Sequence, residues 1–341
     1  MVGSQDSLCL VVYPTELGPI EAQQVNYSIG FKMSLDSTQT GDGNVLESTL
    51  AVRSKPPFHI AVVQNIKRFA RTKPLAFSGG VVIVAMIILA FLTRYAGIAP
   101  YDPYEVGVAS KFGGPFSDAV LGTDQIGRDI LSRLMFGAWV SLKVGLVSAI
   151  VGISGGTIIG IFSAYMGGVV DLVVQRVVDA LMAFPPIILA LGLMAALGAS
   201  DRNVMIALIA ILLPGATRVV RSQALSIKEL DYTLAARAIG ATGGRVIFKH
   251  ILPNVMATYI VLITITLGFA IVVEASLSFL GVGVPPDVAT WGGMLQIGRK
   301  FIDVTSWLAV FPGIAIALVV FSVNFLGDGL RDVLDPKLRG R

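Results

Sequence analysis

Residues that usually carry chemistry are scarce in this sequence of 341 residues. Its single cysteine, Cys9, can form neither an internal disulfide nor a cysteine-based metal site. The two histidines, His59 and His250, lie far apart in the sequence, so we expect no histidine metal cluster. There is no G-x-x-x-x-G-K-[ST] motif to bind the phosphates of ATP, and nothing resembles a catalytic triad. We therefore predict a protein that is not an enzyme and binds no cofactor of its own.

A short segment from Asp231 to Gly240 has the residue types of a docking helix. Asp231 can cap the start of such a helix, and Gly240 suits its end. Four residues share one face at the spacing i, i+3, i+4 and i+7: Tyr232, Ala235, Ala236 and Ile239. This small, apolar face can lie in the groove of a partner protein, or the helix can pack on its own chain. The spacing leaves both alternatives open.

Few charged residues lie close to the long apolar segments, and each needs a reason to be there. Glu274 directly follows an apolar run, where its carboxylate either faces a translocation path or a partner, or orders the loop after it. Asp179 follows Arg176 by three residues, so we expect the two to pair. Lys143 is expected to extend its ammonium group toward the aqueous interface.

Composition places these residues in an all-α polytopic membrane protein. Hydrophobic residues make up 54% of the chain, charged residues only 14%, and the mean hydropathy is +0.77. Six uncharged stretches are candidate transmembrane helices: Leu75–Leu92, Val144–Tyr165, Ala180–Ser200, Val204–Thr217, Pro253–Val273 and Val304–Gly327. Five of them approach the roughly 20 residues that cross a membrane. The fourth, with 14 residues, needs Asn203 and Arg218 at the two interfaces, or is re-entrant.

Lysine and arginine are distributed unevenly around these spans. If the N-terminus is cytoplasmic, 18 of them fall on the cytoplasmic side and 7 on the outside, with Lys143 at the mouth of the second span. This bias predicts that both termini are cytoplasmic, N-in and C-in. Because the positive charges flank membrane spans, we expect no nucleic-acid partner.

The chain divides into three parts. Residues 1–58 are polar and irregular, which indicates either a disordered tail or a mis-annotated extension ahead of a true start at Met33. Residues 59–74 combine basic residues with apolar residues three apart and predict an amphipathic helix on the membrane surface, ended by Pro74. Residues 75–341 form the six-span domain, with the docking helix near 231–240.

Small residues and prolines mark the second, third and fourth spans. A stripe of small residues spaced by four includes Gly152, Gly156 and Gly160. This spacing allows close approach of another helix, from a second subunit or, as we favour, from the same chain. Prolines that interrupt the third and fourth spans, as gating hinges or as static kinks, are Pro185, Pro186 and Pro214.

Four segments resemble permease subunits of binding-protein-dependent ABC importers. The stretch DYTLAARAIGA at 231–241, with HILPN at 250–254, is similar to the coupling loop of that family. It departs from the general signature at Leu234, where glutamate is usual, and at His250, where isoleucine is usual. Three further segments are typical of the C-type subunit in the dipeptide, oligopeptide and nickel branch: LGTDQIGRDILSR at 121–133, EASLSFLGVG at 274–283 and GDGLRDVLDP at 327–336. The resemblance covers about residues 60–341.

The resemblance implies the six-helix permease fold of a type I ABC importer, in a prokaryotic cytoplasmic membrane, that moves di- or oligopeptides. It implies four kinds of partner: a homologous second permease, two ATPase subunits or domains that hold ATP and magnesium, an extracytoplasmic solute-binding protein, and lipid. The segment 231–240 would be the coupling helix that docks on the ATPase. Its candidate coupling residues are Asp231, Tyr232, Ala235, Ala236, Arg237, Ile239 and Gly240.

The segment 123–133 lies in the longest predicted outside loop. It alternates arginine and aspartate after Thr123 and Asp124, which can cap a helix. This pattern predicts an amphipathic helix on the membrane, with contact to the binding protein as a second hypothesis.

Two other functions are compatible with a polytopic membrane protein. An ion-driven secondary transporter would need carboxylates near the bilayer midplane, and the predicted spans contain no central aspartate or glutamate. A membrane scaffold without transport activity would tolerate replacement of the 231–240 segment. Loss of function on changing that segment therefore separates a permease from a scaffold.

Overall fold

The computed structural model describes residues 66–117 and 119–334. The predictions for residues 1–58, and for the first part of the surface helix at 59–65, lie outside the described residues. Residues 66–72 are helical, Lys73 interrupts the helix, and Pro74 is the first residue of the next one. The position of this segment on a membrane surface stays a prediction.

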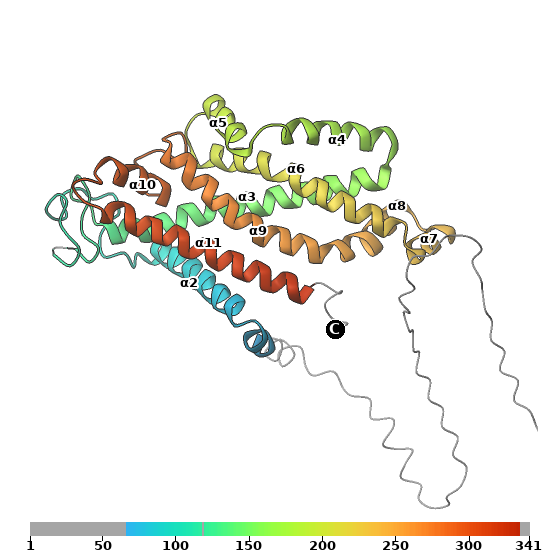
Figure 1. Ribbon diagram of the computed structural model, residues 1–341, viewed down its shortest axis with the longest axis horizontal. Helices are drawn as coiled ribbons and strands as arrows, with labels where there is room; N and C mark the ends of the chain where they lie inside the picture. The colour runs from blue at the N-terminus through green and yellow to red at the C-terminus, as the bar shows by residue number, and fades with distance from the viewer. Residues whose placement is uncertain (1–65, 118, 335–341) are drawn as a thin grey trace, which may run out of the picture. The chain divides into compact units, whose positions relative to one another are not determined.

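The described residues fold into helices and loops, with two isolated bridges and no β-strand. In chain order the elements are α2 (Pro74–Ala96), α3 (Ile130–Met166), α4 (Gly168–Met182), α5 (Pro186–Leu197), α6 (Asp201–Lys228), α7 (Asp231–Ala238), α8 (Gly243–Val246), the π-helical turn η2 (Ile247–Ile251), α9 (Leu252–Phe279), α10 (Trp291–Lys300) and α11 (Trp307–Leu334). The long helices lie side by side in one bundle (Figure 1).

The helices run back and forth between two ends of this bundle. One end carries α7 and the C-terminal ends of α3, α6 and α11, and we call it the α7 end. The other carries α10 and the loop 97–129, and we call it the α10 end (Figure 1).

The bundle is apolar both inside and outside. The most extensive helix pair is α3 with α6, and α9 packs against both α3 and α11. Val144, Leu208 and Leu277 join α3, α6 and α9 in one buried cluster. On the outside, α2 leaves Leu75 65% exposed and Val84 56% exposed. An apolar exterior of this extent requires a lipid environment.

Five helical runs in the described part of the chain are long and apolar enough to cross a membrane. They are α2, α3, α6, the continuous run α8–η2–α9, and α11. The helices α4 and α5 pass the same test only as a pair, and they are bent by 89° at the break between them. The prediction of an all-α membrane protein is confirmed, with six spans if this broken pair counts as one.

The third predicted span, Ala180–Ser200, is wrong as a continuous helix. The break falls at residues 183–185, and Pro185 is extended with φ −55° and ψ 133°. A proline forces the residue before it out of the helical region, and it supplies no backbone N–H for a helix to continue. Pro186 then starts α5, where a missing N–H costs nothing.

The second and fourth predicted spans are too short. The helix α6 has 28 residues and is a candidate span by itself, which favours a crossing helix over a re-entrant segment. The helix α3 begins at Ile130 instead of Val144 and has 37 residues. Its early start is fixed by Asp129, whose carboxylate accepts a hydrogen bond from Ser132 N at 2.8 Å. Counting uncharged residues missed this part because it contains Arg133 and Lys143; in the structure Arg133 is buried and Lys143 pairs with Asp201.

The amphipathic helix predicted for 123–133 is also wrong. Asp124 accepts hydrogen bonds from the backbone N–H groups of Ile126 and Arg128, and its carboxylate lies 2.6 Å from Arg128 Nε. Both side chains are buried, and the helix starts only at Ile130. The alternating charges therefore stabilise a folded loop at the α10 end, and they are not available as a surface for lipid.

Candidate functional site

The docking helix exists as α7, with ends that differ slightly from the prediction. The N-cap residue is Leu230, so Asp231 is the first helical residue and not the cap. Its negative charge still lies at the positive end of the helix dipole. Gly240 has φ +86°, and its N–H donates to Arg237 O at 3.0 Å. With the bond from Ala241 N to Ala236 O, also 3.0 Å, this forms a Schellman ending that favours glycine.

One side of α7 is apolar and exposed. Ile239 is 87% exposed, Ala235 is exposed, and Tyr232 is exposed by about half of its surface. Ala236, the fourth residue of the predicted face, is only partly exposed. The exposed set also includes Leu234, which the spacing argument did not include. An apolar side of this kind on a fixed short helix suits a protein partner.

The other side of α7 is fastened to the end of α3 through Tyr165. The guanidinium of Arg237 lies 5.7 Å from the centre of the Tyr165 ring, and Lys228 Nζ lies 5.8 Å from it. Lys228 also donates to the carbonyl oxygens of Ala164 and Tyr165 at 3.2 Å. A Cβ atom at Gly243 would lie 2.8 Å from the Tyr165 hydroxyl. We call these four side-by-side positions the Tyr165 clasp: Tyr165, Lys228, Arg237 and Gly243.

A second attachment joins α7 to the start of α9. The Tyr232 hydroxyl lies 3.1 Å from Asn254 Nδ2, which also donates to His250 O at 2.6 Å. The rings of Tyr232 and His250 are 5.9 Å apart. The π-helical turn η2 immediately precedes this point. Tyr232 and Arg237 therefore contact their own chain while remaining exposed, and Ala235 and Ile239 are exposed beside them.

The glycine stripe packs inside this chain. A Cβ atom at Gly156 would lie 2.6 Å from Ala216 Cβ, and one at Gly160 would lie 2.7 Å from Thr217 O. At Gly152 the nearest atom would be Leu212 Cβ, at 3.1 Å. All three neighbours belong to α6, so the stripe lets α3 and α6 approach closely.

The three hinge candidates differ in their surroundings. Pro185 and Pro186 sit at the 89° break between α4 and α5. Pro214 lies inside the continuous helix α6 and is buried. Only the first pair therefore interrupts a helix.

Glu274 is fully buried within this chain, which is at odds with direct contact to a partner. Its carboxylate accepts a hydrogen bond from Ser278 Oγ at 2.9 Å, and Ser278 Oγ accepts one from Val284 N at 3.4 Å. The far end of the loop after α9 is held as well, because the backbone N–H of Trp291, at the start of α10, donates to Ser141 Oγ at 3.4 Å. The geometry supports the alternative that Glu274 orders the loop after α9.

The two other charged residues singled out in the sequence, Asp179 and Lys143, each form an ion pair. Asp179 pairs with Arg218 of α6 at 2.5 Å, not with Arg176 as predicted. Lys143, expected to extend toward the aqueous interface, pairs with Asp201 at 2.7 Å. The sequence could not reveal these partners, because they are 39 and 58 residues apart.

Comparisons with known proteins agree with this architecture. A family model described as the binding-protein-dependent transport system inner membrane component matches residues 156–340. A putative peptide transport system permease protein of Brucella suis is 42% identical over 282 residues, covering 82% of this chain and 93% of that protein. The dipeptide transport system permease protein DppC of Alkalihalophilus pseudofirmus is 39% identical, covering 81% and 90%. The glutathione transport system permease protein GsiD of Pectobacterium atrosepticum is 38% identical, covering 80% and 90%.

The family model includes α7, Gly156 and Gly160 of the glycine stripe, and the buried Glu274. The matched proteins are permease subunits of importers whose ATPase is a separate subunit. This agrees with the lack of a G-x-x-x-x-G-K-[ST] motif in the present sequence. The chain belongs to the family of binding-protein-dependent transport system inner membrane components: it is a multi-pass permease subunit of an ABC importer.

Proposed function

We propose that this chain forms half of the pore of an importer for di- or oligopeptides. The relatives that support this carry the words peptide, dipeptide and glutathione in their names. A homologous second permease would supply the other half as a heterodimer. The solute-binding protein would dock outside the membrane and deliver the peptide.

The docking site for the ATPase is proposed to be the exposed side of α7. The observation that carries this is Ile239, 87% exposed on a short helix that is attached to α3 and α9. ATP and magnesium are held by two ATPase subunits, one of which receives α7. The α7 end is then cytoplasmic, which agrees with the N-in and C-in orientation derived from lysine and arginine.

The attachments of α7 give a route for transmission. Closure of the ATPase pair on ATP moves α7, and the Tyr165 clasp carries this movement to the ends of α3 and α6. The pore opens outward, accepts a peptide from the binding protein, and resets inward after hydrolysis.

The experiment that tests the docking site is an Ile239→Glu substitution in the full importer. A buried charge without a partner is costly at an interface, so the ATPase should no longer co-purify and peptide uptake should fall at least about tenfold. The matched control is Val106→Glu, because Val106 is also apolar and 62% exposed but lies at the α10 end. Normal ATPase recovery and uptake with Ile239→Glu would overturn the proposal.

A further inference from the structure

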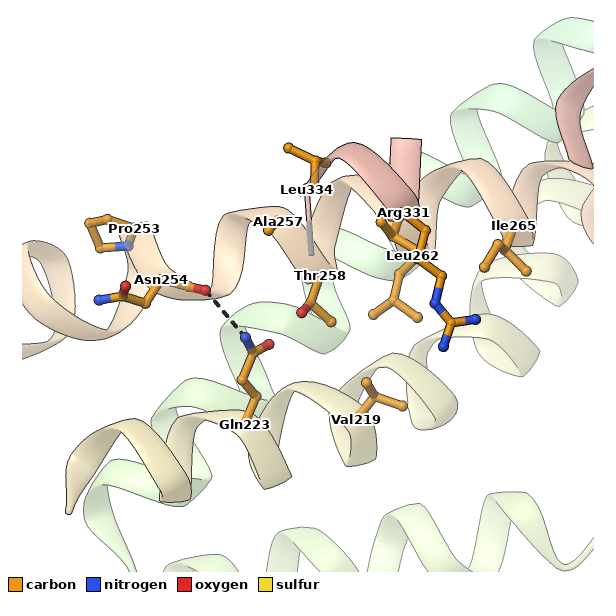
Figure 2. A pocket seen from close by; sticks show the side chains of 11 residues that line it. Val219, Gln223, Pro253, Asn254, Ala257, Thr258, Leu262, Ile265, Arg331 and Leu334 are labelled. Atoms are coloured by element: carbon orange, nitrogen blue, oxygen red, sulfur yellow. Dashed lines mark hydrogen bonds between the residues drawn. The ribbon is translucent and has the colours of Figure 1, made fainter. Parts of the chain in front are cut away.

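A cavity of about 660 Å³ opens between α6, α9 and α11 near the α7 end. Its lining residues are Val219, Gln223, Pro253, Asn254, Ala257, Thr258, Val261, Leu262, Ile265, Arg331 and Leu334. Most of this wall is apolar, with polar groups from all three helices. Figure 2 shows Gln223, Thr258 and Arg331 extending into the same space from α6, α9 and α11. A volume of this size is typical of sites for small molecules, which occupy about 300–1,000 Å³.

Hydrogen-bonding capacity remains unused in this cavity. Gln223 Nε2 donates to Asn254 O at 3.2 Å, the bond drawn in Figure 2. Gln223 Oε1 is buried and has no hydrogen-bond partner among the described residues. A buried amide oxygen without a partner costs free energy, which a donor from a ligand would recover once the Gln223 side chain turns this oxygen toward the cavity. Peptide N–H groups are donors of this kind.

The charge of the cavity is positive. Arg331 is the one ionisable residue among those that line it, and the described residues provide it with no ion pair. The neighbouring Asp332 is already engaged with Lys73 at 2.5 Å. A guanidinium presents parallel N–H donors that fit a carboxylate in a bidentate way. The cavity therefore favours a ligand with a carboxylate beside amide groups.

We propose that this cavity binds the carboxylate end of the peptide cargo, with Arg331 on the carboxylate and Gln223 on the adjoining amide. The inference rests on the proposed function and adds a residue-level cargo site to it. The apolar walls contributed by Val219, Leu262 and Ile265 accept side chains without selecting among them. The site recognises what all peptides share, their C-terminus and backbone.

The cavity wall is connected to the docking helix. Asn254 belongs to the lining, and its side chain bonds to the Tyr232 hydroxyl of α7 at 3.1 Å. The backbone oxygen of the same residue accepts from Gln223. A shift of α7 therefore reaches the cavity through one residue, so cargo can be released when the ATPase moves.

The test is photo-labelling of the importer complex purified without its binding protein. The probe is a tripeptide with a central photoreactive phenylalanine, made as the free acid and as the C-terminal amide. In the unmodified complex, the free-acid probe should attach to the permease at α9, in the proteolytic fragment that contains Ala257 and Thr258. Arg331→Gln should reduce labelling by the acid about tenfold, because a charge-assisted bidentate contact is lost, and leave the weak labelling by the amide unchanged. Arg331→Lys should give an intermediate loss, because it keeps the charge without the fork.

The matched control is Arg202→Gln, an exposed arginine at the opposite end of α6, which should label normally. Equal labelling by acid and amide would overturn the inference, as would full labelling of Arg331→Gln. Loss of co-purified phosphatidylglycerol in Arg331→Gln, with peptide labelling unchanged, would also overturn it and assign the cavity to a lipid phosphate. Failure of the proposed function would be distinguishable from failure of this inference. In that case the unmodified preparation would show no peptide uptake and contain no ATPase.

Discussion

At the scale of single residues, this protein uses small and polar side chains to solve packing problems that its apolar composition creates. Gly156 allows α3 to touch α6, and Asp129 starts α3 inside a buried loop. Glu274 holds the loop after α9 through Ser278. In each case the residue acts on its own chain, although its isolated position in an apolar sequence also suggested a functional role.

Adding one methyl group to the glycine stripe should destabilise the protein. A Cβ atom at Gly156 meets both Ala216 Cβ and Leu213 O at 2.6 Å, so Gly156→Ala forces α3 and α6 apart at a cost of about 1–3 kcal/mol. The measurement is thermal unfolding of the detergent-solubilised chain. Gly215→Ala on the facing helix is the control, since no atom lies within 4 Å of its added Cβ, and alanine is the better helix former. Equal stability of the two variants would contradict the packing account.

At the scale of elements, the short helix α7 and its attachments link the proposed ATPase docking site to the helix bundle. The helix itself could be predicted from sequence, because alanines favour helix and Gly240 ends it in the left-handed region. Its orientation could not. Arg237 is attracted to a ring on Tyr165, 72 residues earlier, and nothing in the local sequence reveals that contact.

Removing the Tyr165 ring should separate ATP hydrolysis from transport. Tyr165→Leu abolishes the ring contacts with Arg237 and Lys228, each worth about 0.5–1 kcal/mol, while leaving the exposed side of α7 unchanged. We expect ATP hydrolysis in proteoliposomes to continue and the peptide imported per ATP to fall severalfold. Tyr165→Phe keeps the ring and should restore coupling. Tyr95→Leu is the control, because Tyr95 also lies against a cation, Arg94, but at the α10 end. An unchanged ratio in Tyr165→Leu would refute the role of the clasp.

At the scale of the whole molecule, hydropathy identified the helical membrane class and the order of the spans. It failed where tertiary contacts compensate for local signals. The charged first part of α3 is helical because Asp129 caps its start and Lys143 pairs with Asp201. Hydropathy also failed at the apolar run 180–200, which breaks at two adjacent prolines. A span count from composition alone therefore returns six, whereas the geometry gives five long runs and one bent pair.

The orientation of the bundle can be measured directly. In a Cys9→Ser background, single cysteines replace Ala238 at the α7 end and Val106 at the α10 end, both of which are exposed. A membrane-impermeant maleimide added to spheroplasts should label the Val106→Cys protein and leave the Ala238→Cys protein unlabelled until the membrane is opened. The reverse pattern would place α7 outside the cell and remove the basis for ATPase docking.

The length of α3 has a mechanical consequence. Its 37 residues contain no proline and extend about 56 Å, nearly twice the ~30 Å hydrocarbon thickness of a membrane. The helix is therefore a single lever that passes through the bilayer and protrudes from it. A tilt of about 5° around its midpoint displaces each tip by roughly 2.5 Å, in opposite directions. Asp129 lies at one tip and Tyr165 at the other, so a displacement of the helix at the α7 end would be matched by an opposite displacement at the loop 97–129.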